Sequence, residues 1–138
     1  MRSFFDTNVL VYMFDRSQPQ KAVVARELLE RCAVDGDAVI SIQVLQEFYA
    51  TVIRKLLPPL NGAEAAAAMR DLVDLDVVEA DVALVLDATV KCHRYKLSFW
   101  DSLIVEAALR GGAKILYTED LQDGQAFESL TVRNPFAG

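Results

Sequence analysis

The chain has 138 residues, of which 53% are hydrophobic, so it is long and apolar enough for one well-packed core. Its formal net charge of −6 argues against a general coat for nucleic acids, although a local basic patch can still bind one. No apolar stretch approaches the roughly 18 residues of a membrane helix, and no basic-then-apolar leader opens the chain. We therefore expect a cytoplasmic protein with no membrane partner, in which residues 1–138 form a single domain. Cys32 and Cys92 lie far apart and lack the spacing of a zinc site or a disulfide framework.

The first predicted element is a strand over residues 3–5 that ends at Asp6. Phe4 and Phe5 stand side by side without polar alternation, which is typical of a central strand covered on both faces of a parallel sheet. Asp6 would then lie at the carboxyl end of this strand, where open α/β sheets bind their ligands. The alternative is that Asp6 only caps the helix that follows.

The rest of the chain alternates helical and strand patterns. Helices are predicted over residues 8–14, 19–32, 42–57, 61–74, 81–96 and 98–110. Strands are predicted over residues 38–40, 77–78, 114–117 and 130–132, the last of them at an edge. This alternation predicts a three-layer α/β/α fold with a central, mostly parallel sheet of about five strands.

Capping signals set several of the helix ends. Ser41 is placed to cap the helix over 42–57, which Pro58 would stop. Asn61 and Glu64 have the spacing of a capping box. The pair Gly111–Gly112 provides the residue type that a left-handed helix end favours.

Helical periodicity also predicts which sides of two helices face the core. In the helix over 81–96, the inward side is predicted to carry Val82, Leu86 and Val90, with Cys92 as a further candidate for it. The outward side is predicted to carry Asp87, Lys91 and Arg94. In the helix over 98–110, Asp101 shares the inward side with Ile104, Val105 and Ala108, whereas Glu106 and Arg110 lie on the other side.

Four carboxylates fall at positions where ionised groups are uncommon, Asp6, Glu47, Asp101 and Asp120. Asp6 and Asp120 follow strands and Glu47 lies in the first turns after another, so all three belong to the carboxyl edge of a parallel sheet. On simple topology Asp101 would open its helix at the opposite edge, and the residues alone therefore bring three acids together. The alternatives are a capping box with Ser98 for Asp101 and a surface position for Glu47.

Clustered carboxylates have a chemical consequence. Ionised carboxylates near one another repel, and their burial costs several kcal/mol unless a cation neutralises them or some become protonated. All-oxygen ligands in a chain with a single histidine indicate Mg²⁺ or Mn²⁺ rather than zinc. A site of this kind typically holds a phosphate group and activates water.

Four segments, in order, strongly resemble the acidic motifs of PIN-domain ribonucleases. They are Asp6-Thr7-Asn8, Ser41 followed by Gln46-Glu47-Phe48, Trp100-Asp101-Ser102, and Leu116-Tyr117-Thr118-Glu119-Asp120. The short length and the Thr-Glu-Asp-Leu-Gln run followed by Gly124-Gln125 are most similar to the VapC toxins of bacterial toxin–antitoxin pairs. The resemblance covers essentially the whole chain and implies a PIN-like fold, in which the helix of the third acid starts at the active edge.

The resemblance implies a metal-dependent endoribonuclease in which water hydrolyses an RNA phosphodiester. The catalytic metal ligands, for Mg²⁺ or Mn²⁺, would be Asp6, Glu47, Asp101 and Asp120. The supporting residues would be Thr7, Asn8, Ser41, Thr118 and Glu119, and position favours Asp120 over Glu119 as the fourth acid. The implied partners are an RNA substrate and a small cognate antitoxin protein, and we also predict a homodimer.

Contacts to partners lead to two further expectations. The RNA backbone would meet either the run 91–96 or Arg54 and Lys55, the alternative for both being a solvated helix face, which is slightly favoured. The antitoxin would insert an arginine or lysine among the acids and lay an apolar helix in a groove near Tyr12 and Phe14. The alternative for these two aromatic residues is an ordinary place in the core.

Two rival functions stay open at this point. Asp6 followed two positions later by Asn8 is also similar to haloacid-dehalogenase-type phosphatases, although those usually place a second aspartate there and need a well-placed lysine. The other rival is a non-catalytic α/β interaction domain whose acids only cap helices. Such a domain would show no saturable metal site.

Overall fold

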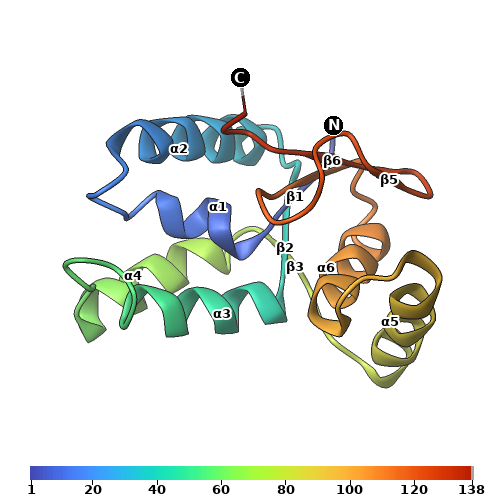
Figure 1. Cartoon of the computed structure of the whole chain (residues 1–138). Coiled ribbons are helices and arrows are strands. Elements are labelled where there is room, and N and C mark those ends of the chain that lie inside the picture. The colour runs from blue at the N-terminus through green and yellow to red at the C-terminus, as the bar shows by residue number, and fades with distance from the viewer. Residues whose placement is uncertain (138) are drawn as a thin grey trace.

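The computed structural model describes residues 1–137 and confirms the predicted α/β/α fold, with a six-stranded sheet between helices (Figure 1). The strands are β1 (Ser3–Phe5), β2 (Ala38–Ser41), β3 (Asp76–Val78), β4 (Ile115–Tyr117), β5 (Ala126–Phe127) and β6 (Leu130–Arg133). The helices are α1 (Thr7–Tyr12), α2 (Pro19–Val34), α3 (Ile42–Val52), α4 (Gly62–Leu72), α5 (Val82–Tyr95) and α6 (Phe99–Arg110). No helix within the described residues is both long and apolar enough to cross a membrane.

The strand order is β3-β2-β1-β4-β6-β5, and all neighbours are parallel except β5 and β6. β1 is therefore a central strand, and Phe4 and Phe5 are fully buried, as predicted. The prediction that residues 130–132 form the edge was wrong, because Ala126 and Phe127 add an antiparallel outer strand. A strand of two residues has no periodicity from which a sequence pattern could detect it.

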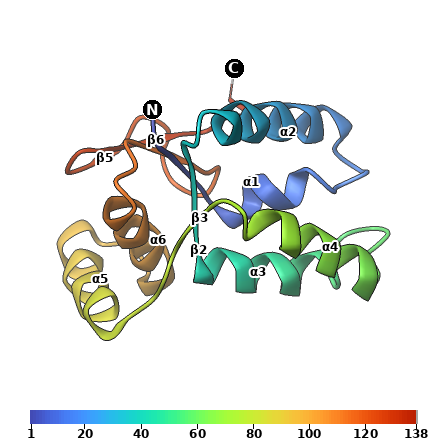
Figure 2. The same cartoon turned by 180° about the vertical axis from the view of Figure 1, so that it is seen from behind.

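Helices cover both faces of the sheet. Helices α1 to α4 lie on one side of it and the pair α5–α6 on the other, as the two opposite views show (Figures 1 and 2). Because β1, β2 and β4 run parallel, their carboxyl ends meet at one edge. The backbone N–H of Asp6 donates to the carbonyl of Tyr117 at 3.0 Å and so joins the ends of β1 and β4.

The predicted caps are present, but one helix is shorter than predicted. Ser41 accepts from the Val44 N–H at 3.3 Å, and both hydrogen bonds of the Asn61–Glu64 capping box form. Helix α3 ends at Val52 rather than at residue 57. There the chain turns back, and the Leu60 N–H donates to the Val52 carbonyl at 2.9 Å, which satisfies the helix end.

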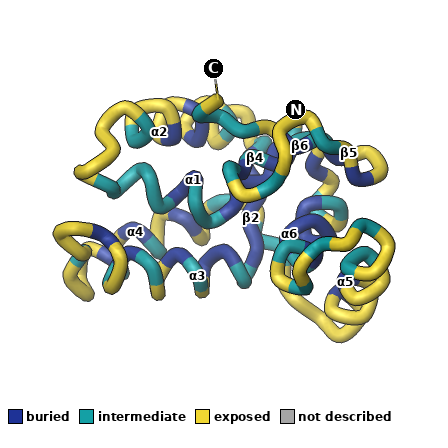
Figure 3. The backbone as a smooth tube through the Cα atoms, viewed as in Figure 1, coloured by how far each residue is buried: buried dark blue, intermediate teal, exposed yellow. Residues whose placement is uncertain are grey.

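The predicted inward side of α5 was wrong. Leu84 and Ala88 face the core, whereas Val82, Leu86 and Val90 are exposed by 75%, 59% and 55% (Figure 3). Both sets satisfy helical spacing, so periodicity alone does not choose between them.

The predicted outward position of Glu106 was wrong for a related reason. Helix α6 is covered by β2 and β3 on one side and by α5 on the other, so almost its whole circumference is buried. Glu106 points into the contact between the two helices, where Lys91 of α5 meets it at 2.6 Å. The outward position predicted for Lys91 was therefore also wrong.

Two helices, rather than one, connect β3 to β4. The two helices run antiparallel, as shown by the ion pair of 2.9 Å between Arg110 at the end of α6 and Asp81 at the start of α5. Helix α6 thus begins where α5 ends and runs back along the sheet to Arg110. Two residues later, Gly112 has a φ of +72°, the left-handed conformation that glycine adopts readily. The simple-topology expectation that Asp101 lies at the opposite edge was wrong, because the intervening hairpin of helices brings the start of α6 to the carboxyl edge.

Candidate functional site

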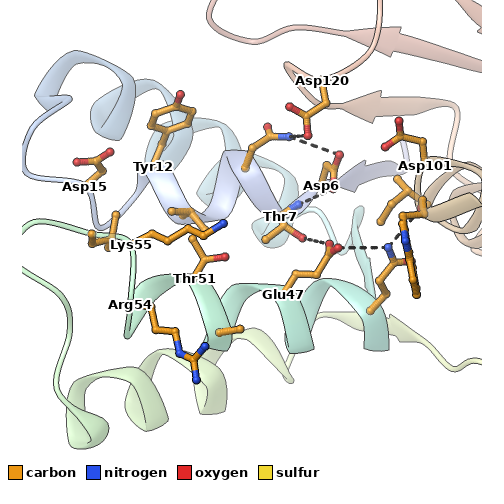
Figure 4. Close-up of a pocket in the computed structure, with 17 residues that line it drawn as sticks. Asp6, Thr7, Tyr12, Asp15, Glu47, Thr51, Arg54, Lys55, Asp101 and Asp120 are labelled. Atoms are coloured by element: carbon orange, nitrogen blue, oxygen red, sulfur yellow. Dashed lines mark hydrogen bonds between the residues drawn. The ribbon is translucent and has the colours of Figure 1, made fainter. Parts of the chain in front are cut away.

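A pocket of about 670 Å³ opens at the carboxyl edge of the sheet (Figure 4). The four carboxylates identified in the sequence all line it, and each comes from a different part of the fold. Asp6 follows β1, Glu47 belongs to α3, Asp101 lies in the first turn of α6, and Asp120 follows β4. The fold therefore brings together four acids that are far apart in the chain.

Asp6 is the most buried of the four, with 6% of its surface exposed. Its Oδ1 accepts from the Thr7 N–H at 2.7 Å, so Asp6 does cap α1. Its Oδ2 accepts from the Thr118 hydroxyl at 2.8 Å. The capping role is thus real, but it uses one oxygen and leaves the carboxylate on the wall of the pocket.

The pKa of the Asp6 carboxyl is raised to about 7, chiefly by burial and further by the nearby charges of Asp120 and Glu47, which together outweigh the opposing hydrogen bonds from Thr118 and Thr7. Within residues 1–137, no lysine or arginine forms an ion pair with it. The folded chain therefore holds a carboxylate whose negative charge it does not neutralise itself.

Small polar side chains hold Glu47 and Asp120 in place. The Thr7 hydroxyl donates to Glu47 Oε1 at 2.8 Å. The Asn8 amide donates to Asp120 Oδ2 at 3.0 Å and to Thr118 Oγ1 at 3.1 Å. Its orientation is fixed because its own oxygen accepts from the Glu119 N–H at 3.2 Å. Thr7, Asn8 and Thr118 thus form the polar scaffold of the pocket.

Asp101 differs from the other three acids. Ser98 accepts from the Asp101 N–H at 3.1 Å and caps α6, but in the described residues no hydrogen bond engages the Asp101 carboxylate. Of the two hydrogen bonds of the capping box predicted as the alternative for Asp101, the described part of the chain therefore contains the one to Ser98 Oγ and not the one to the Asp101 carboxylate. The carboxylate is left to face the pocket, across from Asp6 and Asp120 (Figure 4).

Three of the predicted supporting residues, Ser41, Thr118 and Glu119, do not line the pocket, although Thr118 donates to Asp6. Ser41 is buried beneath α3, where its hydroxyl serves as the helix cap. The Glu119 carboxylate accepts from the Tyr12 hydroxyl and pairs with Lys21 at 3.1 Å. The structure thus places Asp120, and not its neighbour Glu119, at the pocket.

The donor set fits a hard divalent cation, because it consists of carboxylate oxygens and includes the uncompensated Asp6. Within residues 1–137, no three acidic, histidine or cysteine side chains lie close enough to enclose an ion by themselves. Mg²⁺ usually keeps several waters and takes only one or two protein carboxylates, so it does not require such a cage. The fit rests on the chemistry of the donors rather than on a preformed coordination shell.

The basic residues separate into two groups. Arg54 and Lys55 line the pocket at the end away from Asp101 (Figure 4). The run 91–96 lies outside the pocket lining, and Lys91 pairs with Glu106 at 2.6 Å and Glu128 at 3.5 Å. The structure therefore favours Arg54 and Lys55 over Lys91 as cations available to a ligand in the pocket.

Sequence reasoning missed part of the pocket wall. Gln43 Nε2 lies 3.5 Å from Glu47 Oε2 and donates to the Trp100 carbonyl at 3.3 Å, so it links α3 to α6. Gln43 precedes Glu47 by one helical turn, and this i, i+4 spacing was an available signal. Tyr12 lines the pocket, whereas Phe14 packs edge-on against the fully buried Phe48 with ring centroids 5.7 Å apart.

Comparison with known proteins gives a consistent result. No curated protein matches the chain. The solved structure of VapC20 from Mycobacterium tuberculosis, a toxin that cleaves the sarcin-ricin loop, shares 18% identity and a TM-score of 0.63 over 86% of this chain and 89% of its own. VapBC2 from Rickettsia felis, bound to a DNA fragment from its promoter, shares 19% identity and a TM-score of 0.65 over 97% of this chain and 98% of its own.

At these identities the two structures are similar to this chain in fold alone. The model of the PIN domain family, by contrast, matches the sequence itself over residues 3–124, a span that contains Asp6, Glu47, Asp101 and Asp120. This match covers far more than half of the chain, and the chain therefore belongs to the PIN domain family.

Proposed function

We propose that this protein is a divalent-metal-dependent endoribonuclease, with Mg²⁺ or Mn²⁺ as its ion, and the toxin of a toxin–antitoxin pair. The observation that carries the proposal is the convergence of four carboxylates on one pocket around Asp6, whose charge no basic side chain neutralises in the described residues. Membership of the PIN domain family and the likeness in fold to VapC20 support RNA as the substrate. The phosphatase alternative has no comparable support.

In this proposal Asp6, Glu47, Asp101 and Asp120 hold the cation. A cation bound there neutralises charge on the phosphate and lowers the pKa of a water molecule. Thr7, Asn8 and Thr118 fix the directions of the Asp6, Glu47 and Asp120 carboxylates through hydrogen bonds that the fold already contains, so little reorganisation of these three is needed when substrate binds. No side chain is needed as a covalent nucleophile.

The basic end of the pocket binds the RNA backbone. Lys55 and Arg54 lie on the part of the pocket wall away from Asp101, where Asp15 is the acid beside them (Figure 4). A strand that passes the acids thus meets a cation at the next phosphate. Lys91 does not contribute, because two glutamates already neutralise it.

The proposal is tested by incubating the purified protein with mixed cellular RNA, either with Mg²⁺ or Mn²⁺ or with a chelator. We expect cleavage only with metal, and none by Asp6→Asn. The matched control is Asp87→Asn, which also removes one carboxylate but lies outside the pocket on exposed α5. Full cleavage by a folded Asp6→Asn protein would overturn the assignment of the site.

Toxicity is tested by expression in a bacterial host. Wild-type protein should arrest growth, whereas Glu47→Gln should not, because the amide keeps the packing of α3 and its bond from Thr7 but loses the charge. Equal growth arrest by the two proteins at equal expression would show that any toxicity is unrelated to the pocket.

The partner in this proposal is a small cognate antitoxin that inserts an arginine or lysine among the four acids and competes with the metal. Tyr12 lines the pocket and is the better candidate for its docking groove, since Phe14 packs on buried Phe48. Co-purification with the protein encoded beside it should lower metal affinity, and unchanged affinity in the complex would refute this mode of inhibition. A cytoplasmic location and a homodimer stay predictions, the second checked by the molecular mass in solution.

A further inference from the structure

Trp100 is the only tryptophan of the chain, and 64% of its surface is exposed. It is the second residue of α6, directly before Asp101, and it lines the same pocket as the acids. Large aromatic side chains contribute most to stability when they are buried, so burial does not account for a tryptophan at this position, and its place on the pocket wall is the feature to interpret.

The surroundings hold the backbone of Trp100 and leave its ring open. Its carbonyl accepts from Gln43 Nε2 at 3.3 Å, which ties this residue to the helix that carries Glu47. The neighbouring Phe99 ring meets the indole at 68°, with centroids 5.3 Å apart. This is an edge contact rather than flat stacking, so at least one face of the indole remains free.

We propose that Trp100 is a stacking platform for an unpaired RNA base beside the phosphate that is cut, so that the substrate is single-stranded at that position. This inference rests on the proposed function and adds a residue that positions the substrate. A base in a duplex has both faces covered by its neighbours, whereas an unpaired base offers a face to an aromatic ring.

The charges at the two ends of the pocket favour a base over a phosphate at Trp100. Asp101 is adjacent, and a negative phosphate would be repelled there, whereas a neutral base is not. Lys55 and Arg54 lie at the end of the pocket away from Asp101 (Figure 4). A strand with its base on Trp100 and its backbone near Lys55 would therefore carry the intervening phosphate past the acids.

Because the chain has one tryptophan, fluorescence excited selectively at tryptophan and not at the four tyrosines reports this site alone. The Asp6→Asn protein, which binds without cutting, is titrated with a short single-stranded RNA of mixed sequence, with the same RNA as a duplex, and with an abasic strand of equal length. We expect saturable quenching by the single strand only. The abasic strand keeps every phosphate, so quenching by it would overturn the platform, as would absence of quenching by the single strand.

A second measurement compares Trp100→Leu, Trp100→Phe and wild type in RNA cleavage with Mg²⁺ or Mn²⁺. Loss of base stacking should raise KM roughly tenfold in Trp100→Leu with a smaller change in kcat. Trp100→Phe keeps an aromatic ring, so its KM should lie close to that of wild type. Leu86→Ala is the matched control, because it shortens another exposed apolar side chain, on α5 and outside the pocket. Since Trp100 is exposed, all three variants should unfold at temperatures close to that of wild type.

The outcomes separate this inference from the proposed function. An unchanged KM in Trp100→Leu, with metal-dependent cleavage by wild type, would refute the platform and leave the nuclease standing. Quenching by single-stranded RNA without any cleavage by wild type would support the platform and refute the nuclease. If Trp100→Leu instead loses self-association or its bound antitoxin while KM stays unchanged, Trp100 is a protein contact and the platform is wrong.

Discussion

Two buried carboxylates, Asp6 and Glu106, have nearly the same exposure, at 6% and 5%, yet opposite surroundings. Glu106 lies between α5 and α6, where Lys91 meets it at 2.6 Å and Arg110 at 3.6 Å. Asp6 lies at the end of β1, where it meets hydroxyl and amide donors and the charges of other acids. The chain itself neutralises the Glu106 carboxylate but not the Asp6 carboxylate.

The difference separates a structural acid from one that is available to a ligand. Burial alone would lower the pKa of Lys91, but its hydrogen bonds with Glu106 and Glu128 and their charges outweigh burial and raise that pKa. The pKa of Asp6 is raised because burial there is not compensated by a cation. A buried charge is costly unless it is paired, so the unpaired one marks the place for an external cation.

The largest expected effect is on catalysis. Asp6→Asn and Asp101→Asn should each lower RNA cleavage by about 10³-fold or more, because a lost metal site removes several kcal/mol of transition-state stabilisation. Neither variant should lower the free energy of unfolding measured without metal, since each removes a like charge from a crowded pocket. A large loss of stability in Asp6→Asn would contradict the contrast with Glu106.

The next largest effect is on stability at the other site. Lys91→Met should lower the free energy of unfolding by about 3 kcal/mol, because it leaves Glu106 buried with a more distant partner. Urea unfolding checks this value against Lys114→Met, the same change at an exposed lysine. If both variants lose equally little, the buried pair contributes nothing and the comparison between the two acids fails.

The sequence predicts a residue's position when neighbouring residues in the chain determine it, and does not when the packing of distant elements determines it. The placement of Asp6 follows from Phe4 and Phe5, because an unbroken apolar pair predicts a central strand and the next residue then lies at its carboxyl end. The caps at Ser41 and Asn61 are equally local, and both were predicted at the right residues.

The pairing of Glu106 is not local, and the sequence did not predict it. Helix α5 has two apolar sets, one with Leu86 and one with Leu84, and both satisfy helical spacing. The choice between them depends on how α6 packs against α5, and the Lys91–Glu106 ion pair lies in that contact. For the same reason, the contact of Gln43 with the Trp100 carbonyl follows only from the convergence of α3 and α6.

A smaller effect should appear with pH. The pKa of Asp6 in the folded chain is about 7, above its ordinary value of 3.8, so ionisation is less favourable in the folded state. Its contribution to stability is fully present below the ordinary value and is lost as the pH rises through about 7. Metal-free wild type should lose about 1–3 kcal/mol relative to Asp6→Asn between about pH 5 and about pH 8. Parallel unfolding curves for the two proteins across this range would argue against a buried, uncompensated carboxylate.

The smallest effect concerns the scaffold of the pocket. Thr118→Val removes the hydroxyl that donates to Asp6 at 2.8 Å and should lower the free energy of unfolding by about 1 kcal/mol. Loss of this donor should also raise the pKa of Asp6 further and weaken metal binding. Thr118→Ser keeps a hydroxyl, so its stability and its metal binding should both be close to those of wild type. Thermal unfolding with and without Mn²⁺ measures the two effects, and a serine variant as weak as the valine variant would assign them to packing instead.

The central claim is tested most directly by calorimetric titration of Mn²⁺ into three folded proteins, wild type, Asp6→Asn and Glu106→Gln. The two variants each remove one buried carboxylate, so they differ only in whether the chain neutralises that group itself. We predict saturable binding by wild type, unchanged affinity in Glu106→Gln, and affinity at least about tenfold weaker in Asp6→Asn. Absence of saturable binding in wild type, or equal losses in the two variants, would contradict the account.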